Sequence, residues 1–294
     1  MDIKIGTLVG GFEAAKRIAQ IKQYGFETFA INFWQTALDG DLGELACQVK
    51  EALADSDAQI SCIGVYGNPL MDDEAGRASY ESFKRIIKSA RKFGAELVSG
   101  FTGGIVGKSV EESIPRFKEV FSELCAMADA EGIKIVLENC PMGGTWSNVT
   151  QNLAFCPQAW ELIFNALPYD NIGLQWEPCH AMTQLIDPIA QLRKWVGRIY
   201  NVHGKDATIA CDVIREHGIS SGHAWIWHRM PGFGDSNWTD IISILRMNGY
   251  VGSIDIEGWH DPVYRDTLEY TGQVHALRYL KQCRGGDILP CPVL

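Results

Sequence analysis

Apolar and β-branched residues gather in short runs along this chain, and amphipathic stretches of helical length separate the runs. The runs have the character of buried strands, and they recur eight times: residues 3–10, 27–33, 59–67, 95–101, 133–139, 172–178, 198–206 and 252–258. Near-continuous apolar strands that alternate with helices are typical of a parallel sheet covered by helices. Eight such units in 294 residues predict an α/β fold, a closed (β/α)8 TIM barrel that forms a single domain over residues 1–294.

An open, doubly wound sheet is the competing architecture, but it usually has fewer strands and a glycine-rich phosphate turn after the first one. The first strand here ends in GTLVGG, which lacks the G-x-G-x-x-G spacing of that turn. Two connections are long, residues 140–155 after the fifth strand and residues 207–235 after the seventh. Loops that follow barrel strands form the catalytic face, so we expect these two loops to be lids or walls of a substrate site.

Composition narrows the choice of partner. The formal net charge of −10 and the pI of about 5.2 argue against binding to nucleic acid or to an anionic membrane. The nine cysteines contain no C-x-x-C pair, which is typical of reduced thiols rather than of a disulfide framework or a zinc–thiolate site. No basic leader precedes an apolar stretch of signal length, and no window approaches a membrane span. We therefore expect a cytoplasmic protein that binds a small neutral or cationic molecule.

Metal-capable side chains end four consecutive strands of the predicted barrel. Glu138 ends the fifth strand, Glu177 the sixth and Glu257 the eighth, while His203 lies at the end of the seventh. A lone Glu or His at a strand end is more often structural, but four on neighbouring strands of one rim predict a shared site. Three carboxylates that converge would repel one another without a cation. This donor set suits Mn²⁺ best, with Mg²⁺ or Co²⁺ as the other candidates.

Four motifs around these residues carry a resemblance to a known family. They are ENCPM after the fifth strand, EPCH after the sixth, VHGKD after the seventh and R-x-PGFGD-x-x-W before the last unit. In this order they resemble the xylose-isomerase-like superfamily of sugar isomerases and epimerases, which includes ketose 3-epimerases, inosose dehydratases and hydroxypyruvate isomerases. The likeness covers essentially the whole chain.

The resemblance implies roles for individual residues. It makes Glu138, Glu177, His203 and Glu257 the metal ligands, and Glu138 and Glu257 also the catalytic acid/base pair. It gives His180 and Arg229 contacts to substrate oxygens, whereas from the sequence alone a helix cap for His180 and a loop salt bridge for Arg229 are equally good readings. The family usually has Asp at the position of Glu177, and the extra methylene moves the carboxylate by about 1.5 Å.

The chemistry of such a site follows from the acidity of its substrate. A carbon next to a carbonyl loses its proton to a carboxylate only when the developing enediolate is stabilised, and a divalent ion supplies that stabilisation. A second carboxylate can return the proton to the opposite face, which is epimerisation, or to the neighbouring carbon, which is isomerisation. We expect a metal-dependent sugar isomerase or epimerase acting on an unphosphorylated keto sugar.

Two alternatives stay open at this stage. The same site can serve a lyase that eliminates water or an aglycone from a 3-oxo sugar glycoside or an inosose, including C-glycoside cleavage. A non-catalytic barrel that binds a sugar or a partner subunit is the alternative from another class. An endonuclease-like hydrolase needs more histidines and a basic groove, which the acidic charge argues against.

Tryptophans provide the last indication of a sugar site. Several lie at predicted strand ends or in loops of the catalytic face: Trp34, Trp146, Trp176, Trp225, Trp227 and Trp259. Aromatic rings stack on sugars or aglycones, and we expect two or three of these to line the pocket, with Trp146 and Trp176 as substrate-binding residues. Others would serve subunit contacts, since we expect a homodimer or homotetramer, with a second type of subunit as a further option.

Overall fold

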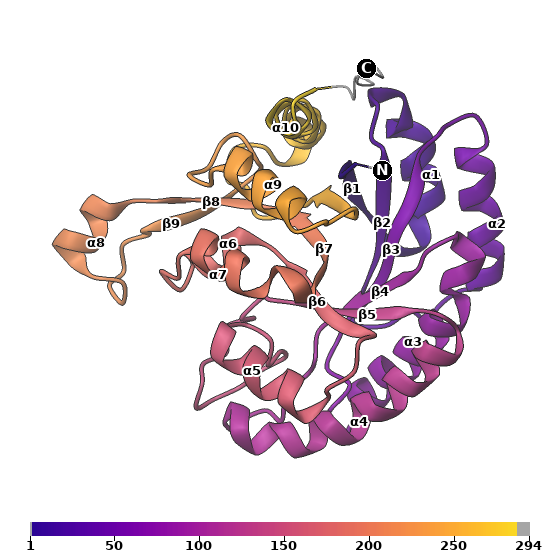
Figure 1. Cartoon of the computed structure of the whole chain (residues 1–294), viewed down its shortest axis with the longest axis horizontal. Helices are drawn as coiled ribbons and strands as arrows, with labels where there is room; N and C mark the ends of the chain where they lie inside the picture. Colours follow the sequence, from indigo (N-terminus) through magenta and orange to yellow (C-terminus); the bar gives the residue numbers. More distant parts are fainter. Residues whose placement is uncertain (1, 287–294) are drawn as a thin grey trace, which may run out of the picture.

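Eight parallel strands close into a barrel in the computed structural model, which describes residues 2–286 (Figure 1). The barrel strands are β1 (Lys4–Gly10), β2 (Thr28–Trp34), β3 (Gln59–Tyr66), β4 (Leu97–Gly100), β5 (Lys134–Glu138), β6 (Ile172–Trp176), β7 (Ile199–Gly204) and β10 (Ser253–Ile256). They pair in chain order, and β10 closes the ring between β7 and β1. Each predicted apolar run coincides with one of these strands, although β2 extends one residue past its run, to Trp34, so the (β/α)8 barrel prediction is confirmed. Met1 and residues 287–294 of the predicted domain lie outside the described part of the chain.

Helices follow the strands and cover the outside of the barrel (Figure 1). The covering helices are α1 (Ala14–Ile21), α2 (Leu42–Leu53), α3 (Glu74–Ser89), α4 (Val110–Ala130), α5 (Pro157–Ala166), α7 (Pro188–Trp195), α9 (Trp238–Met247) and α10 (Glu269–Arg284). The local sequence determines where several helices begin. The Asp41 side chain accepts hydrogen bonds from backbone amides in the first turn of α2, and Ser109 and Glu112 form a reciprocal capping box at the start of α4.

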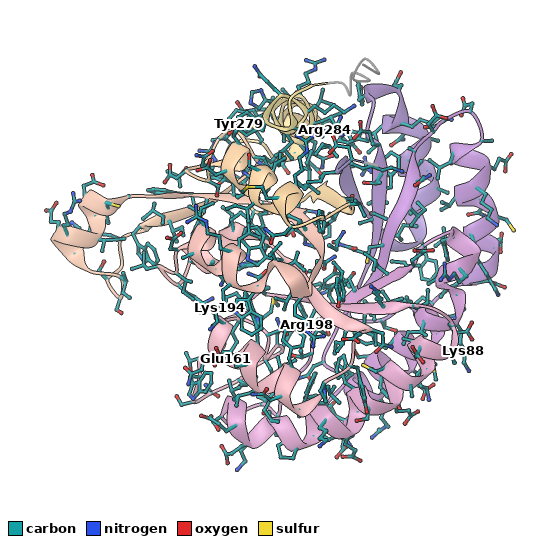
Figure 2. All side chains as sticks on the ribbon, viewed as in Figure 1. Lys88, Glu161, Lys194, Arg198, Tyr279 and Arg284 are labelled. Carbon is teal, nitrogen blue, oxygen red and sulfur yellow. The ribbon has the colours of Figure 1, made fainter. Side chains whose placement is uncertain are left out.

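The main hydrophobic core lies between the strands and the helices. Its largest fully buried side chains are Trp160, Trp176 and Trp238, and the inward stripe of each amphipathic helix packs against it. The outer helix faces carry charged pairs, such as Lys194 and Glu161, whose Nζ and Oε1 atoms lie 2.7 Å apart (Figure 2). This layering leaves the carboxyl ends of the strands as the place where polar side chains can gather.

A hairpin arm occupies the long connection after β7 that we predicted over residues 207–235. The arm consists of β8 (Asp206–Ile209), α8 (Cys211–His217) and β9 (Ile226–Arg229), and its two strands pair antiparallel. Figure 1 shows the arm extending away from the barrel. The pattern did not predict the hairpin inside this connection, because each strand has only four residues and pairs with the other, so neither shows the apolar run of a barrel strand.

Eight of the nine cysteines lie in the described part of the chain and are free thiols there, while Cys291 lies outside it. Within residues 2–286, none of the helices combines the length and apolar character that crossing a membrane requires.

Candidate active site

The two-residue period of the strands brings the site residues to the inside of the barrel. Along a strand, alternate side chains face the same way, so Glu257 lies on the same side of its strand as Asp255, two residues earlier. The same spacing relates His203 to Asn201 in β7 and Glu177 to Gln175 in β6, and all of these side chains are buried. The barrel interior therefore carries one polar layer within the strands and a second layer at their carboxyl ends.

Three of the predicted ligands form the centre of the upper layer. Ligand atoms of Glu138, His203 and Glu257 all lie within 4.8 Å of one another. The Nδ1 atom of His203 is 3.1 Å from Oε2 of Glu257 and 3.9 Å from Oε2 of Glu138. Two carboxylates thus flank one imidazole, each with only 6% of its residue surface exposed to solvent.

Glu177 and His180 join this centre from the side. Glu177 is the last residue before helix α6 (Pro178–Met182), so the chain turns directly after the carboxylate and places His180 back over it. The Nε2 atom of His180 contacts Oε1 of Glu177 and lies 3.8 Å from Oε1 of Glu138. The structure therefore places all four predicted ligands and His180 in one buried region.

Lys205 is a further charged member of the site. It follows His203 by two residues, is 3% exposed, and its Nζ contacts Oε1 of Glu257. A buried ammonium beside a carboxylate offsets part of the repulsion among the acidic groups. The sequence places Lys205 near the site, but its ion pair with Glu257 depends on a side-chain direction that the pattern does not give.

These contacts push the pKa values of the two catalytic candidates apart. Burial, and then the charge of Glu257, raise the pKa of Glu138 to about 7. Burial also acts to raise the pKa of Glu257, but the Lys205 charge and the hydrogen bond with His203 outweigh it and lower that pKa below its ordinary value. Burial lowers the pKa of His180 well below its usual range, with the Lys205 charge acting in the same direction. Two carboxyl groups whose pKa values are shifted in opposite directions are suited to acid/base catalysis.

The donor set fits a divalent cation. Among residues 2–286, the Oε2 atom of Glu177 and the Nε2 atom of His203 are buried without a hydrogen-bond partner, while Oε1 of Glu177 contacts His180. Unpaired buried polar atoms cost free energy, and a coordinated cation would remove that cost. Carboxylate oxygens with one or two imidazoles suit hard or borderline ions. Two neighbouring groups, Glu138 with Cys140 and His180, and Cys179 with His180 and His228, also bring ligand atoms together.

Two asparagines that sequence reasoning missed hold the carboxylates in place. The Nδ2 atom of Asn139 donates to the carbonyl of Glu177 (3.0 Å), and its Oδ1 accepts from the Glu177 amide (2.9 Å). The Nδ2 atom of Asn152 donates to the carbonyls of Glu138 and Cys140, both at 2.8 Å. The position of Asn139 directly after Glu138 is the one sequence signal for its role.

A line of hydrogen bonds supports the site from the layer below. The Tyr66 hydroxyl donates to Oε1 of Gln175 (2.8 Å), and Nε2 of Gln175 donates to Oδ1 of Asn201 (2.7 Å). The Nδ2 atom of Asn201 then donates to Oδ2 of Asp255 (3.1 Å), whose Oδ1 accepts from Thr28 (2.6 Å). Networks of satisfied buried groups are rigid, so this line fixes the strands that carry the upper layer.

The remaining predicted substrate-binding residues lie in three different settings. Trp176 is fully buried in the hydrophobic core, where its Nε1 donates to Gln191, so its ring is outside the buried acidic region. Trp146 is partly exposed, and its Nε1 donates to Glu111 at the start of α4. The Nε atom of Arg229, on the arm, donates to Oδ2 of Asp261 at 3.2 Å, which is the loop salt bridge that the sequence left open.

Comparison with known sequences gives relatives of low identity. A model of the family described as xylose isomerase-like TIM barrel matches residues 18–283. The chain is 23% identical over 242 residues to the protein YfiH of Bacillus subtilis, covering 71% of this chain and 74% of YfiH. It is 27% identical over 181 residues to an inosose dehydratase of Clostridium perfringens, covering 58% of this chain and 55% of the dehydratase.

Comparison with solved structures gives the same fold. The E. coli 3-keto-D-glucoside 4-epimerase YcjR superposes with a TM-score of 0.69 at 17% identity, covering 96% of this chain and 100% of YcjR. A xylose isomerase-like TIM barrel protein of Mycobacterium smegmatis, solved in complex with magnesium, superposes with a TM-score of 0.70 at 16% identity. This match covers 96% of this chain and 98% of the M. smegmatis protein. At these identities the likeness shows the fold alone. The family match spans nearly the whole described chain, and this protein belongs to the xylose isomerase-like TIM barrel family.

Proposed function

We propose that this protein is a divalent-metal-dependent enzyme that abstracts a proton next to the carbonyl of an unphosphorylated keto sugar and returns it as an epimerase or isomerase. Glu138, Glu177, His203 and Glu257 would hold the metal ion. Glu138 and Glu257 would act as the acid/base pair, and His180 would bind a substrate oxygen.

The observation that carries this proposal is the placement of two buried carboxyl groups, Glu138 and Glu257, on either side of His203. Glu257, whose pKa is lowered by Lys205 and His203 against the effect of burial, is ionised at neutral pH and ready to accept a proton. In the metal-free protein, burial and the Glu257 charge raise the pKa of Glu138 to about 7, so Glu138 is the one of the two that more readily holds a proton. One base and one acid in the same buried region are what proton abstraction and return require.

The residues of this chain then divide the reaction into steps. Glu257 takes the proton from the carbon next to the carbonyl, and Glu138 gives its own proton to the opposite face of that carbon, which yields the epimer. If Glu138 instead delivers its proton to the former carbonyl carbon, and the hydroxyl proton of the neighbouring carbon moves to the former carbonyl oxygen, the product is the isomer. Lys205 keeps Glu257 ionised before the first step, and burial of the site excludes water from the reacting carbon.

A bound divalent ion would supply Lewis-acid stabilisation of the negative charge that develops on the substrate oxygens. Support for such an ion comes from the unpaired buried Oε2 atom of Glu177 and from similar barrels solved with magnesium, or, for the protein IolI, with zinc. We propose Mn²⁺ as the working ion, with Mg²⁺ or Co²⁺ as substitutes.

Elimination is the second candidate, and the likeness to inosose dehydratases favours it. In that reaction Glu257 removes the same proton, and Glu138 protonates a leaving hydroxyl or glycosidic oxygen on the next carbon. The cationic side chains of Lys205 and Arg229, beside the site, are already paired with carboxylates and so are not free to bind a phosphate. This supports an unphosphorylated substrate for both elimination and epimerisation.

Proton NMR in D₂O with Mg²⁺ tests the proposal. The substrates are a panel of free ketoses, an inosose and 3-oxo glycosides, offered to the wild-type protein and to Glu138→Gln. Glu161→Gln is the matched control, because this exposed carboxylate on α5 pairs with Lys194 far from the barrel interior. We expect deuterium next to the carbonyl, together with an epimer or isomer, from the wild type and the control but not from Glu138→Gln.

The other outcomes separate the alternatives. Release of water or aglycone with deuterium exchange assigns the protein as a lyase. A stoichiometric bound metal without exchange in any substrate would overturn the carbon-acid chemistry and favour a non-catalytic sugar-binding barrel. Absence of any bound metal would overturn the metal site itself.

A further inference from the structure

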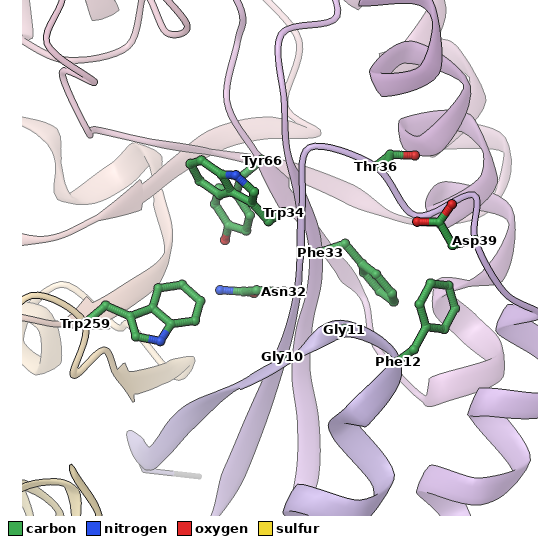
Figure 3. Close-up of a pocket in the computed structure, with 10 residues that line it drawn as sticks. All are labelled: Gly10, Gly11, Phe12, Asn32, Phe33, Trp34, Thr36, Asp39, Tyr66 and Trp259. Atoms are coloured by element: carbon green, nitrogen blue, oxygen red, sulfur yellow. The ribbon is translucent and has the colours of Figure 1, made fainter. Parts of the chain in front are cut away.

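A cavity of about 330 Å³ opens at the carboxyl ends of β1, β2 and β3 (Figure 3). Its lining includes Gly10, Asn32, Trp34 and Tyr66 from the three strand ends, and Trp259 from the loop after β10. The volume lies within the range of about 300–1,000 Å³ that small-molecule sites occupy. None of these residues has a role in the acid/base chemistry described above.

The cavity adjoins the reacting groups through two connections. Trp259 follows the catalytic candidate Glu257 by two residues, and β10 pairs directly with β1, so the cavity wall continues from that carboxylate. On the other side, the Tyr66 hydroxyl donates to Gln175, which is the register partner of Glu138. A molecule bound at Glu138 and Glu257 would therefore extend into this cavity.

Two exposed indoles face the cavity. Trp34 is 60% exposed and Trp259 is 46% exposed, which is unusual for the largest hydrophobic side chain. Trp34 is braced by an edge-on contact with Phe101, whose ring centroid lies 6.4 Å away. Rigid, exposed aromatic rings at the mouth of a barrel are suited to stacking on a flat ring.

Backbone strain holds both tryptophans in position. The residue directly after each one, Gln35 after Trp34 and His260 after Trp259, adopts a left-handed conformation, with φ of 64° and 72°. Non-glycine residues rarely adopt this region, because it costs free energy, and such strain concentrates at ligand sites. A left-handed residue directly after the tryptophan on both sides of one cavity indicates that the two indoles are oriented for a ligand.

A polar group lies between the two indoles. Figure 3 shows the side chain of Asn32 extending from β2 between Trp34 and Trp259. Asn32 is 6% exposed, and its Oδ1 atom has no hydrogen-bond partner among residues 2–286. An unpaired buried amide oxygen accepts a hydrogen bond, so beside stacking surfaces it matches a ring that carries a hydroxyl group.

We infer that this cavity is a second ring-binding subsite, in which Trp34 and Trp259 hold the sugar or aromatic ring attached to the sugar that reacts at Glu138 and Glu257. The inference rests on the proposed function and deepens it: the preferred substrates are glycosides with two rings rather than free monosaccharides.

Binding of unreactive glycosides tests the inference without any turnover. The probes are methyl β-D-glucoside with one ring, cellobiose with a second sugar ring and phenyl β-D-glucoside with an aromatic one, each titrated by calorimetry into the Mg²⁺-loaded protein. The variants are Trp34→Ala and Trp259→Ala, with Trp227→Ala as the control, because Trp227 is 37% exposed but lies on the arm outside the cavity lining. Circular dichroism checks that each variant folds.

We expect at least one two-ring probe to bind about tenfold more tightly than the methyl glucoside. The better probe identifies the ring as sugar or aromatic. Trp34→Ala and Trp259→Ala should each remove this advantage, and Trp227→Ala should keep it. Equal binding of all three probes, or an advantage that survives both substitutions, would overturn the subsite, as would failure of every probe to bind.

Sedimentation of the unliganded variants tests whether the exposed tryptophans instead form a subunit contact. A shift to a smaller species in Trp34→Ala and Trp259→Ala, without loss of ring binding, would make the cavity rim a subunit contact and overturn the inference. The D₂O exchange experiment stays independent. Tighter binding of a two-ring probe without deuterium exchange would reject the proposed chemistry but keep the subsite. Deuterium exchange without tighter binding of a two-ring probe would keep the chemistry and reject the subsite.

Discussion

Lys205 is the residue on which the charge balance of the site depends. Its ammonium is buried, and it contacts the Glu257 carboxylate beside His203. Removal of one partner of a buried ion pair leaves an uncompensated charge, which typically costs about 3–5 kcal/mol. In the metal-free protein, Lys205→Met should therefore lower the free energy of unfolding by about 3 kcal/mol, measured by urea denaturation.

The double variant Lys205→Met/Glu257→Gln is the control for this prediction. It removes both charges, so it should be more stable than Lys205→Met alone. Addition of Mg²⁺ should stabilise Lys205→Met more than the wild type, because a divalent ion supplies the missing positive charge. Equal stability of the single and double variants would show that the ion pair has no energetic role.

The protonation of Glu138 predicts how metal binding depends on pH. Burial and the Glu257 charge raise the pKa of this carboxyl from 4.5 to about 7 in the folded protein. The folded state therefore holds more protons than the unfolded state between those values, and the stability of the metal-free protein falls as pH rises through this window. A divalent ion binds the carboxylate form, so its affinity should rise over the same window.

We expect Mg²⁺ affinity to increase by up to about tenfold per pH unit between about pH 5 and pH 7 and to level off above that. Calorimetry in two buffers of different ionisation enthalpy would also detect the proton that binding releases. The raised pKa of His203, where interactions with Glu257 outweigh burial, works in the same direction. An affinity that stays constant across this range would contradict the shifted pKa of Glu138.

At the scale of elements, a single asparagine locks strands β5 and β6 in the register that the site requires. The Asn139 side chain pairs reciprocally with both backbone groups of Glu177, so it fixes this proposed metal ligand relative to its neighbour Glu138. Loss of a group that orients a ligand typically costs about 10–100-fold in metal affinity. Asn139→Ala should weaken Mg²⁺ binding by that factor in calorimetry.

Ser109→Ala separates this effect from a general loss of stability. Ser109 caps helix α4 on the outside of the barrel, and its removal should cost about 1 kcal/mol in urea denaturation. Metal affinity should be unchanged in this variant. If both substitutions weakened metal binding equally, Asn139 would have no specific part in orienting Glu177.

The elements that sequence could predict were those with a strong local pattern. Each barrel strand carries an apolar run, and parallel topology brings the strand ends to one rim, so the grouping of Glu138, His203 and Glu257 could be predicted before the structure. The five-residue helix α6 and the four-residue strands of the arm have no such pattern. Asn152 contacts residues 12 to 50 positions away in the chain, which periodicity cannot reveal.

At the scale of the whole molecule, the protein combines a barrel that carries the site with an arm that contributes little to the core. Helix α8 at the tip of the arm has no buried residues, and Ile219 beside it is 53% exposed. Arg229 and His228 at the base of the arm, in contrast, lie against Asp261 and His180 near the site. The base therefore belongs to the catalytic face, and the tip is structurally separate from it.

Deletion of the tip tests this division. The amide of Ala210 donates to the carbonyl of Trp225 at 2.8 Å, so a Gly-Gly turn can replace residues 211–224 without moving the strands. Because α8 buries no side chains, we expect the shortened protein to unfold within about 3 °C of the wild type and to bind Mg²⁺ with the same affinity. A second variant with a Gly/Ser loop of the original length should behave alike, since loop closure costs little extra free energy. Sedimentation of both variants would also test the predicted homodimer or homotetramer. Dissociation to monomers with unchanged metal binding would place the subunit contact at the tip. A large drop in melting temperature would instead show that the arm is part of the folded core.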